Sequence, residues 1–356
     1  MQRDMHYYAT YALARAAGLR ADAAREIATC AEYVDHADRV AVVCQDGFEI
    51  RAEPTSHHPS GRADYTTPRD QRRTWIPFHF LPGNQGDSLD ERLLCAMDSP
   101  IARAVLDHAL ERLDRDLGVP LLGIVAHAYA DTFAHYGFSG ISSPMNRVDE
   151  ASFVFHCSAA ARAALAARRD RFVARYASGP LAGRLLCLGH GSVATFPDEP
   201  YLAWEFDYAS PARPSGKREN AKTFLVCCER LHDFFVRARA RLDGGYDDPG
   251  AYRDFAHMRS TIRAILAVEG DVRERVDAWK GAAGAGLLYR RPEPIPDYDA
   301  HMLDGEIRAF ALQDRERVER TLACRFLQAA NLHRGYLLDE LLPANGLNVE
   351  SVPIDW

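Results

Sequence analysis

The stretch "GIVAHAYADTFAHYGFSG", residues Gly123–Gly140, places two histidines and one aspartate in an otherwise apolar sequence. On an α-helix, side chains four positions apart advance by roughly 40° around the axis, so His127, Asp131 and His135 share one face. The apolar residues around them predict that this helix is buried. A buried carboxylate is costly unless it is paired with a cation or binds a metal ion.

These three side chains have two interpretations. Imidazole and carboxylate groups are common ligands of zinc and of similar divalent ions. The alternative is a hydrogen-bonded polar trio that fixes neighbouring helices in the core. Since the third member and the apolar setting favour ligation, we predict a buried metal site that includes His127, Asp131 and His135.

The composition limits the classes of function. The chain has 356 residues, of which 47% are hydrophobic, and this is enough for a large core. Its net charge of -7 does not attract polyanions in general, so we expect no stable complex with nucleic acid. A bound metal ion could still hold a phosphate group locally.

Neither a signal peptide nor a membrane span is expected. The first residues contain no apolar signal-peptide core, and the chain has no run of 18 apolar residues. We therefore expect a soluble, cytoplasmic protein. The eight cysteines form no CxxC pair, and we expect them to be reduced thiols.

Helical periodicity covers most of the chain and predicts a mainly α fold. The predicted helical segments are 7–37 with a break at Gly18, 101–117, 120–136, 147–177, 181–188, 220–242, 249–269 and 301–342, with a break allowed in the last. Long irregular loops are predicted at 41–99 and 189–208, with a short hairpin at Val40–Ile50. We expect a single helical domain over residues 1–356, a multi-helix bundle whose loops form a metal site at one end. Residues 1–210 would carry the site, and residues 220–342 would complete the bundle.

Further candidate ligands precede the central helix. His6 lies on the edge of the first predicted helix, and Asp35 ends the second. His79 stands between Phe78 and Phe80 in a proline-bounded aromatic loop, where a buried imidazole needs a partner. Each of these residues has an ordinary explanation when it is considered alone, as a surface or core residue.

More candidates follow the central helix. His190 is flanked by Gly189 and Gly191, which let the backbone approach another group closely. Asp198 and Glu205 follow in the same predicted loop. Together with the earlier candidates, these residues supply enough ligands for more than one metal ion.

The order of these residues resembles that of the zinc-dependent phospholipase C/P1 nuclease superfamily, and of a bacterial branch of it. The resemblance is one of motif order over roughly the first 210 residues, carried by "MHYYATYALARAAGL", "AYADTFAHYGFSG" and "GHGSVATFPDEPYLAW". Those enzymes hold three zinc ions at one end of a helical bundle and hydrolyse phosphate esters. The resemblance implies a hydrolase of a phosphodiester or phosphomonoester with two or three divalent ions. Zinc is the first expectation, and iron or manganese would also suit such ligands.

The resemblance also implies which residues would share each ion. Asp35, His79, His127 and Asp131 would hold one ion, and Asp131 would bridge to a second ion that His6 also binds. In this scheme Asp131 is a catalytic residue through the ions it joins, and Asp35 is the catalytic residue that orients or deprotonates the attacking water.

The third site departs from the family pattern. His135 and His190 would hold this ion, but Ala194 occupies the position of the family's acidic ligand. Asp198 or Glu205 would have to replace it. The family also uses the amine and carbonyl of its processed N-terminal residue, which here leaves Asp4 as a substitute or a site with only two ions.

Other residues have weaker functional interpretations. Arg72 and Arg73 could contact a phosphate group, although solvated loop charges are the simpler explanation for them. Four aromatic residues could line a pocket mouth or belong to the core: Trp75, Phe78, Phe80 and Trp204.

Two competing functions stay open. The adjacent His232 and Asp233 would suit an HD-type phosphohydrolase, or one edge of an amphipathic helix. In a non-catalytic protein, a structural metal or a polar network would only hold the helices together, because a structural zinc site is closed by four protein ligands.

Overall fold

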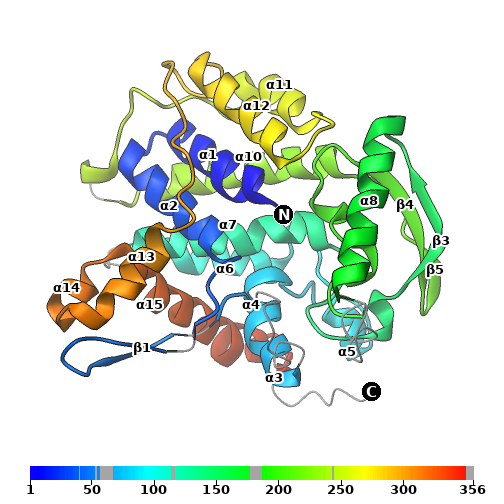
Figure 1. Cartoon of the computed structure of the whole chain (residues 1–356), viewed down its shortest axis with the longest axis horizontal. Coiled ribbons are helices and arrows are strands. Elements are labelled where there is room, and N and C mark those ends of the chain that lie inside the picture. The colour runs from blue at the N-terminus through cyan, green and yellow to red at the C-terminus, as the bar shows by residue number, and fades with distance from the viewer. Residues whose placement is uncertain are drawn as a thin grey trace.

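The computed structural model describes residues 1–39, 41–52, 54–56, 67–113, 117–176, 187–242 and 244–349. Helices dominate this part of the chain, as Figure 1 shows, so the predicted mainly α class is confirmed. The finer expectation of a bundle with the site at one end stays a prediction.

Helix α7 (Gly118–His135) is the central element, and every one of its residues is buried. A helix that is apolar on all sides needs neighbours on all sides. Five helices pack against it: α2 (Ala21–Tyr33), α4 (Ile76–His79), α6 (Pro100–Leu110), α10 (Asn220–Arg239) and α15 (Leu322–Gly335). The helix singled out by the sequence therefore forms the centre of the main core.

The N-terminal segment follows the sequence expectation closely. A π-helical segment, η1 (Asp4–Ala9), continues into α1 (Thr10–Ala16), and α2 follows after a turn. Gly18 allows this turn because its φ of +91° lies in the left-handed region that favours glycine. Both predicted helices and the break between them are confirmed.

The second half of the chain adds helices around this core. Segment 249–269 contains α11 (Phe255–Leu266), and segment 301–342 is broken into several helices, as predicted: α13 (Met302–Ala309), α14 (Arg315–Glu319), α15, and the π-helical η9 (Tyr336–Leu341) that precedes α16 (Leu342–Ala344). Helix α12 (Val272–Gly284) was not predicted. It packs against α11 and against η1, so it brings the second half of the chain to the N-terminus.

The predicted helix at 147–177 is wrong in its first part. Residues Val148–Phe155 form strand β3, and only then does α8 (Ala159–Tyr176) begin. Strand β3 pairs antiparallel with β4 (Ala203–Ala209), so the predicted loop 189–208 ends in a strand. Two short strands complete this sheet: β5 (Ala212–Pro214) and β6 (Arg218–Glu219). The helix predicted at 181–188 falls mostly outside the described residues.

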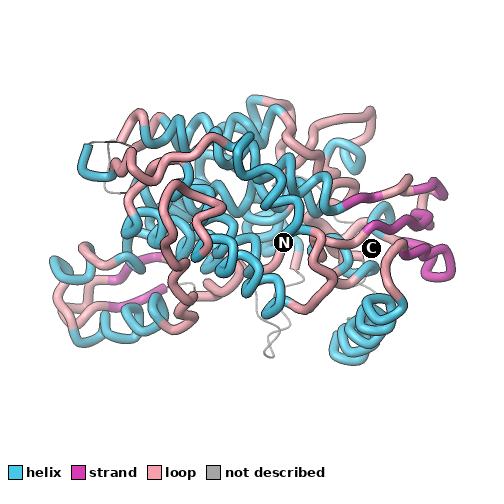
Figure 2. Tube along the Cα trace, turned by 90° about the horizontal axis from the view of Figure 1, so that it is seen from above, coloured by secondary structure: helices cyan, strands magenta, loops and turns pink. Residues whose placement is uncertain are grey.

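The sheet forms because its side chains alternate between a buried and an exposed face. Trp204, Phe206 and Tyr208 on β4 are buried, and with Phe138 and Phe196 they form a second core beside the main one. Because Trp204 is fully buried there, its interpretation as a core residue holds. The sheet and α8 lie at one end of the long axis in Figures 1 and 2.

The loop predicted at 41–99 is only partly irregular. It contains the expected hairpin of β1 (Ala41–Val43) and β2 (Glu49–Arg51), in which Val42 pairs with Ile50. Its described residues also form four short helices: α3 (Pro68–Asp70), the π-helical η3 (Gln71–Trp75), α4 and α5 (Leu89–Arg92). Helix α4 packs against α7 and ends at His79, so it carries this histidine to the central helix.

None of the helices in the described part of the chain is both long enough and apolar enough to cross a membrane.

Gly123 sets the distance between α2 and α7. A Cβ atom at this position would lie 2.3 Å from the Ile27 carbonyl oxygen and 2.7 Å from Cys30 Cβ. We predict that Gly123→Ala forces the helices apart and destabilises the protein by about 1–3 kcal/mol. Gly281→Ala is the matched control, because it lies in α12 with nothing within 4 Å and should be neutral or stabilising. Urea unfolding measures both, and equal stabilities would contradict the close-packing argument.

Candidate metal centre

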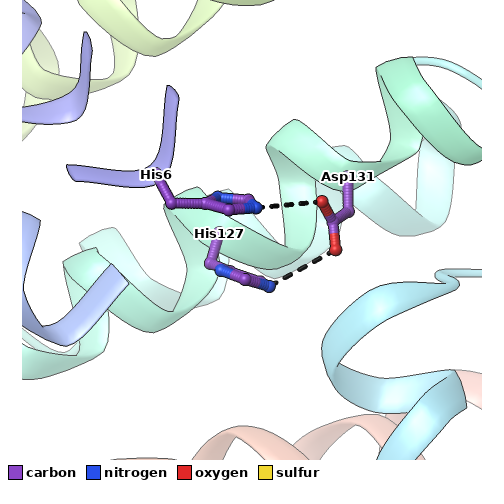
Figure 3. A group of neighbouring side chains, drawn as sticks. All are labelled: His6, His127 and Asp131. Carbon is purple, nitrogen blue, oxygen red and sulfur yellow. Dashed lines mark ion pairs between the residues drawn. The ribbon is translucent and has the colours of Figure 1, made fainter. Parts of the chain in front are cut away.

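The carboxylate of Asp131 lies at the centre of a group of nitrogen atoms. Asp131 itself is 1% exposed. Five nitrogens lie within 3.7 Å of its oxygens: the Met1 α-amine at 2.5 Å, His6 Nε2 at 3.2 Å, His79 Nδ1 at 3.2 Å, His127 Nε2 at 3.3 Å and His135 Nδ1 at 3.7 Å. Figure 3 shows His6 and His127 pointing at this carboxylate from η1 and α7. The predicted face of α7 is therefore in contact with nitrogen atoms from three other segments: the N-terminus, η1 and α4.

Three groups of side chains are arranged so that each could hold a metal ion. Within each group the potential ligand atoms lie within 4.8 Å of one another. The groups are His6, His127 and Asp131; Asp35, His79 and His127; and His135, His190 and Asp198. The structure therefore brings together all eight residues that the sequence predicted as metal ligands. The grouping differs in one respect, because His127 rather than Asp131 is the member common to the first two groups.

Backbone carbonyls fix two of the imidazoles that face Asp131. His79 donates Nε2–H to the Thr55 carbonyl, and His127 donates Nδ1–H to the Ala31 carbonyl, both at 2.8 Å. In these tautomers the remaining nitrogens, His79 Nδ1 and His127 Nε2, carry lone pairs and lie 3.2 Å apart. Two lone pairs that face each other and a carboxylate require a cation or an added proton between them.

Hydrogen bonds to backbone carbonyls also orient His135 and His190, the two histidines of the third group. His135 donates Nδ1–H to the His79 carbonyl at 2.8 Å, and His190 donates to the Ala194 carbonyl at 2.6 Å. Both therefore present Nε2 to Asp198. Histidines that ligate metals usually donate their other ring N–H to a carbonyl or carboxylate in this way.

His6 tests whether these residues fit a metal ion. Its side chain is 1% exposed, and its ring stacks on His127 with 3.7 Å between centroids. Neither ring nitrogen has an aligned hydrogen bond to any described residue, although Nε2 lies 3.2 Å from Asp131. A buried polar group without a partner is costly, and a metal ion bound at Nε2 would supply the missing partner. The donor set therefore fits a divalent ion.

The ionisation states also suit metal binding. Burial, with neighbouring positive groups, lowers the pKa of His6 from 6.5 to about 3. Burial alone would raise the pKa of Asp131, but His135, the α-amine and His127 outweigh it and hold this pKa well below its ordinary value. Burial is likewise outweighed at Asp35, whose pKa is lowered by His127, His6 and His79. Neutral imidazoles and ionised carboxylates are the forms that metals bind.

The N-terminal amine, and not the Asp4 side chain that we expected to replace it, lies beside the carboxylates of the centre. The Met1 amine lies 2.5 Å from Asp131 and 3.3 Å from Asp198. The Asp4 carboxylate instead pairs with Arg275 at 2.8 Å, so its predicted role as a substitute is wrong. Side-chain patterns could not identify Met1, because its contribution is a backbone group.

The third group resolves the choice between Asp198 and Glu205. Asp198 Oδ1 lies 3.2 Å from His135 Nε2, and Asp198 Oδ2 lies 3.8 Å from His190 Nε2. Glu205 faces the other way and pairs with His156 at 2.9 Å on the exposed side of the sheet. Asp198, and not Glu205, therefore lies where it could replace the acid that is missing at Ala194.

The centre is reached from solvent at two residues. The Asp35 side chain is 34% exposed and that of His190 is 21% exposed, whereas the other ligand candidates are almost fully buried. Trp75 is half-buried, with its ring 5.5 Å from that of His79, and Phe80 stacks on His135 at 4.7 Å. A small molecule would therefore meet Asp35 or His190 first.

The remaining sequence candidates lie outside the three groups. His232 donates Nε2–H to the Arg253 carbonyl at 3.0 Å, and Asp233 is exposed. Among the described residues neither belongs to a group that could hold a metal, so the geometry gives no support to an HD-type site. Phe78 is fully buried in the main core, while Arg72 and Arg73 are partly buried in η3.

A sequence model for a protein family matches residues 1–341, and its description is a family of unknown function, DUF6765. The chain belongs to this family. The match spans the metal-binding candidates and also helices α10–α15, so both parts belong to the same family unit. No curated protein and no solved structure matches the chain.

The metal-free protein should lose stability in acid. Burial lowers the pKa of His6 to about 3, of His190 to about 4 and of His333 to about 4, all from 6.5. Their stabilising effect is complete above pH 6.5 and decreases as pH falls toward these values, by up to about 2 kcal/mol per histidine at pH 5. Urea unfolding of chelator-treated protein at pH 7 and pH 5 checks this. In His333→Gln, which keeps a donor for Pro77, the loss should be smaller, and an unchanged loss would contradict the assignment.

An alkaline loss should come from the N-terminus. Burial alone would lower the pKa of the Met1 amine, but Asp131, Asp198 and Asp35 outweigh it and raise this pKa from 8.0 to about 11. Its stabilising effect is therefore complete below pH 8 and decreases as pH rises through 11. The same unfolding series, extended from pH 8 to pH 10.5, should show a falling midpoint, whereas a flat profile would argue against the buried ion pair.

Proposed function

We propose that the protein is a metal-dependent hydrolase of a phosphate ester, a phosphodiester or phosphomonoester, of the zinc-dependent phospholipase C/P1 nuclease type. The observation that carries the proposal is the sharing of ligands between neighbouring groups. His127 belongs to two of the three groups, and the two oxygens of Asp131 lie 3.2 Å from His6 Nε2 in one group and 3.2 Å from His79 Nδ1 in the next. Shared ligands keep metal ions close together, as in enzymes that clamp the two sides of a phosphate displacement. Two or three divalent ions are proposed, with zinc as the first choice and iron or manganese as alternatives.

The residues divide into buried and accessible ones. Asp131, His6 and His127 are 1% exposed, so they would hold ions without touching solvent. When bound, the ions would lower the pKa of a water molecule and neutralise phosphate oxygens. Asp131 is thus the bridging carboxylate in this proposal, and its role is to supply negative charge at the middle of the cluster.

Asp35 is the proposed catalytic base. It has the most exposed carboxylate of the three groups, and its oxygen lies 3.8 Å from both His79 Nδ1 and His127 Nε2. A carboxylate that is fixed on one side and open on the other can orient an incoming water molecule and accept its proton. Its lowered pKa keeps it ionised at neutral pH, which is the form that can accept a hydrogen bond from a water molecule.

The alternative is a non-catalytic protein held together by a structural metal. A closed structural zinc site needs four protein ligands and excludes water. This cluster offers eight side chains and an amine, and it is open to solvent at Asp35 and His190. An excess of ligands with an open side favours catalysis over a purely structural role.

Metal content tests the proposal first. Protein purified without chelator should contain two or three equivalents of zinc, iron or manganese, measured by plasma mass spectrometry. Asp131→Asn keeps the shape of the side chain but removes the charge that the ions share, so it should lose at least two equivalents. His257→Asn, on the exposed face of α11, is the control and should keep all of them. A wild-type protein that binds no metal, even after reconstitution, would overturn the proposal.

Asp35→Asn separates catalysis from metal binding. If Asp35 is the base, this variant should lose about 10²–10⁴-fold in kcat on an activated phosphate ester and keep most of its metal. Bis(p-nitrophenyl) phosphate and p-nitrophenyl phosphate distinguish diester from monoester hydrolysis. A metal-loaded wild-type protein that cleaves neither these nor a wider ester panel would favour the structural role.

A further inference from the structure

A single buried arginine of α12 joins the two ends of the candidate centre. The guanidinium of Arg275 is fully buried. It donates to Asp4 at 2.8 Å, to Glu199 at 2.9 Å, to Gln2 Oε1 at 2.6 Å and to the Gly270 carbonyl at 2.7 Å. None of the side chains that Arg275 contacts is a candidate metal ligand, but Gln2 directly follows Met1, Glu199 directly follows Asp198, and Asp4 lies two residues before His6.

The bonded residues belong to the two segments that close the cluster. Gln2 and Asp4 lie in the chain between the Met1 amine and His6, and Glu199 directly follows Asp198. Gln2 also donates to Glu199 at 3.2 Å, so the two segments are tied to each other as well as to Arg275. The same two segments also carry the Met1 amine and Asp198. The amine nitrogen lies 3.3 Å from Asp198 Oδ1 and 2.5 Å from Asp131 Oδ1.

Packing alone does not explain why these charged side chains are buried together. Asp4 and Glu199 are both almost fully buried, and two buried carboxylates are costly without a fixed cation. Glu199 has a second partner in Arg168, but the carboxylate of Asp4 makes its ion pair with Arg275. Removing the guanidinium would leave the segment that begins at Met1 with an uncompensated charge.

We propose that Arg275 is the positioning residue of the candidate metal centre. It holds residues 1–4 and 198–199 against each other, so that the Met1 amine and the Asp198 carboxylate face Asp131. Helix α12 therefore contributes to the centre without supplying a ligand. The consequence for metal binding rests on the proposed function, whereas the placement of the amine does not.

Lysine cannot replace this arginine. The guanidinium makes its four contacts with Nε, Nη1 and Nη2 in fixed directions. An ammonium group has one nitrogen and cannot reach acceptors on both sides of the fork. Arg275→Lys keeps the positive charge but should release one of the two segments.

The accessibility of the Met1 amine tests this inference without any metal. In chelator-treated wild-type protein, reductive methylation should modify the buried amine slowly and the exposed Lys222 quickly, as read by mass spectrometry of peptides. In Arg275→Lys the rate at Met1, relative to Lys222, should rise about tenfold or more, because the segment opens locally. The chain has only three lysines, so the products are readily assigned.

Arg15→Lys is the matched control. Arg15 is also buried and also pairs with two carboxylates, Glu293 at 2.6 Å and Asp248 at 3.2 Å, but it contacts neither segment of the centre. This variant should lose comparable stability without exposing Met1. If Arg275→Lys does not fold, Asp4→Asn removes the same ion pair more gently and should also speed methylation. A folded Arg275 variant with Met1 as protected as in the wild type would overturn the inference.

Metal retention gives the second measurement. Under competition with a chelator, Arg275→Lys should release one metal equivalent at least tenfold faster than the wild type, and Arg15→Lys should not. If the wild type binds no metal but Arg275→Lys still exposes Met1, the proposed function fails and the positioning role stands. If the wild type binds metal and both Arg275 readouts are unchanged, only the positioning role fails.

Discussion

The negative charge of Asp131, placed in the middle of an apolar helix, is the constraint on which the rest of the structure depends. Helix α7 is buried along its whole length, so this carboxylate cannot be solvated by water. Its charge is compensated by nitrogen atoms from three other segments, the N-terminus, η1 and α4, and from His135 in the last turn of α7 itself. The close contact of α2 with α7 at Gly123 then fixes His127 through the Ala31 carbonyl.

The centre therefore shows how a polar site can organise an apolar fold. Four of its five histidines, all except His6, use one nitrogen to bond a backbone carbonyl and the other to face the carboxylates. For His79, His127 and His135 the backbone bond joins two segments of the chain, and the other ring nitrogen is left free to bind an ion or a proton. Structural and functional roles are thus divided between the two nitrogens of the same ring, so replacing one of these histidines would affect both stability and ligand binding.

Much of this arrangement could be predicted from the sequence, because it depends on local spacing. The separation of His127, Asp131 and His135 by four residues is sufficient to place them on one face, and motif order was sufficient to add Asp35, His79 and His190. The strands β3 and β4 were missed because the alternation in "AWEFDYA" is short and its partner strand is distant in the sequence. Arg275 was missed for a similar reason: in "VRERVDAWK" it resembles a solvated helix charge, and only the fold brings it to Asp4 and Glu199.

The position of Arg275 in the chain has a consequence for biosynthesis. All eight side-chain ligand candidates have been synthesised once the ribosome passes Asp198, but α12 is made later. A nascent chain thus carries a complete set of donors before it has the residue that holds two of their segments in place. A metal ion that binds to such an incomplete chain would be held by more mobile ligands and would exchange more readily. Once α12 has been made, Arg275 would fix these segments and slow the exchange.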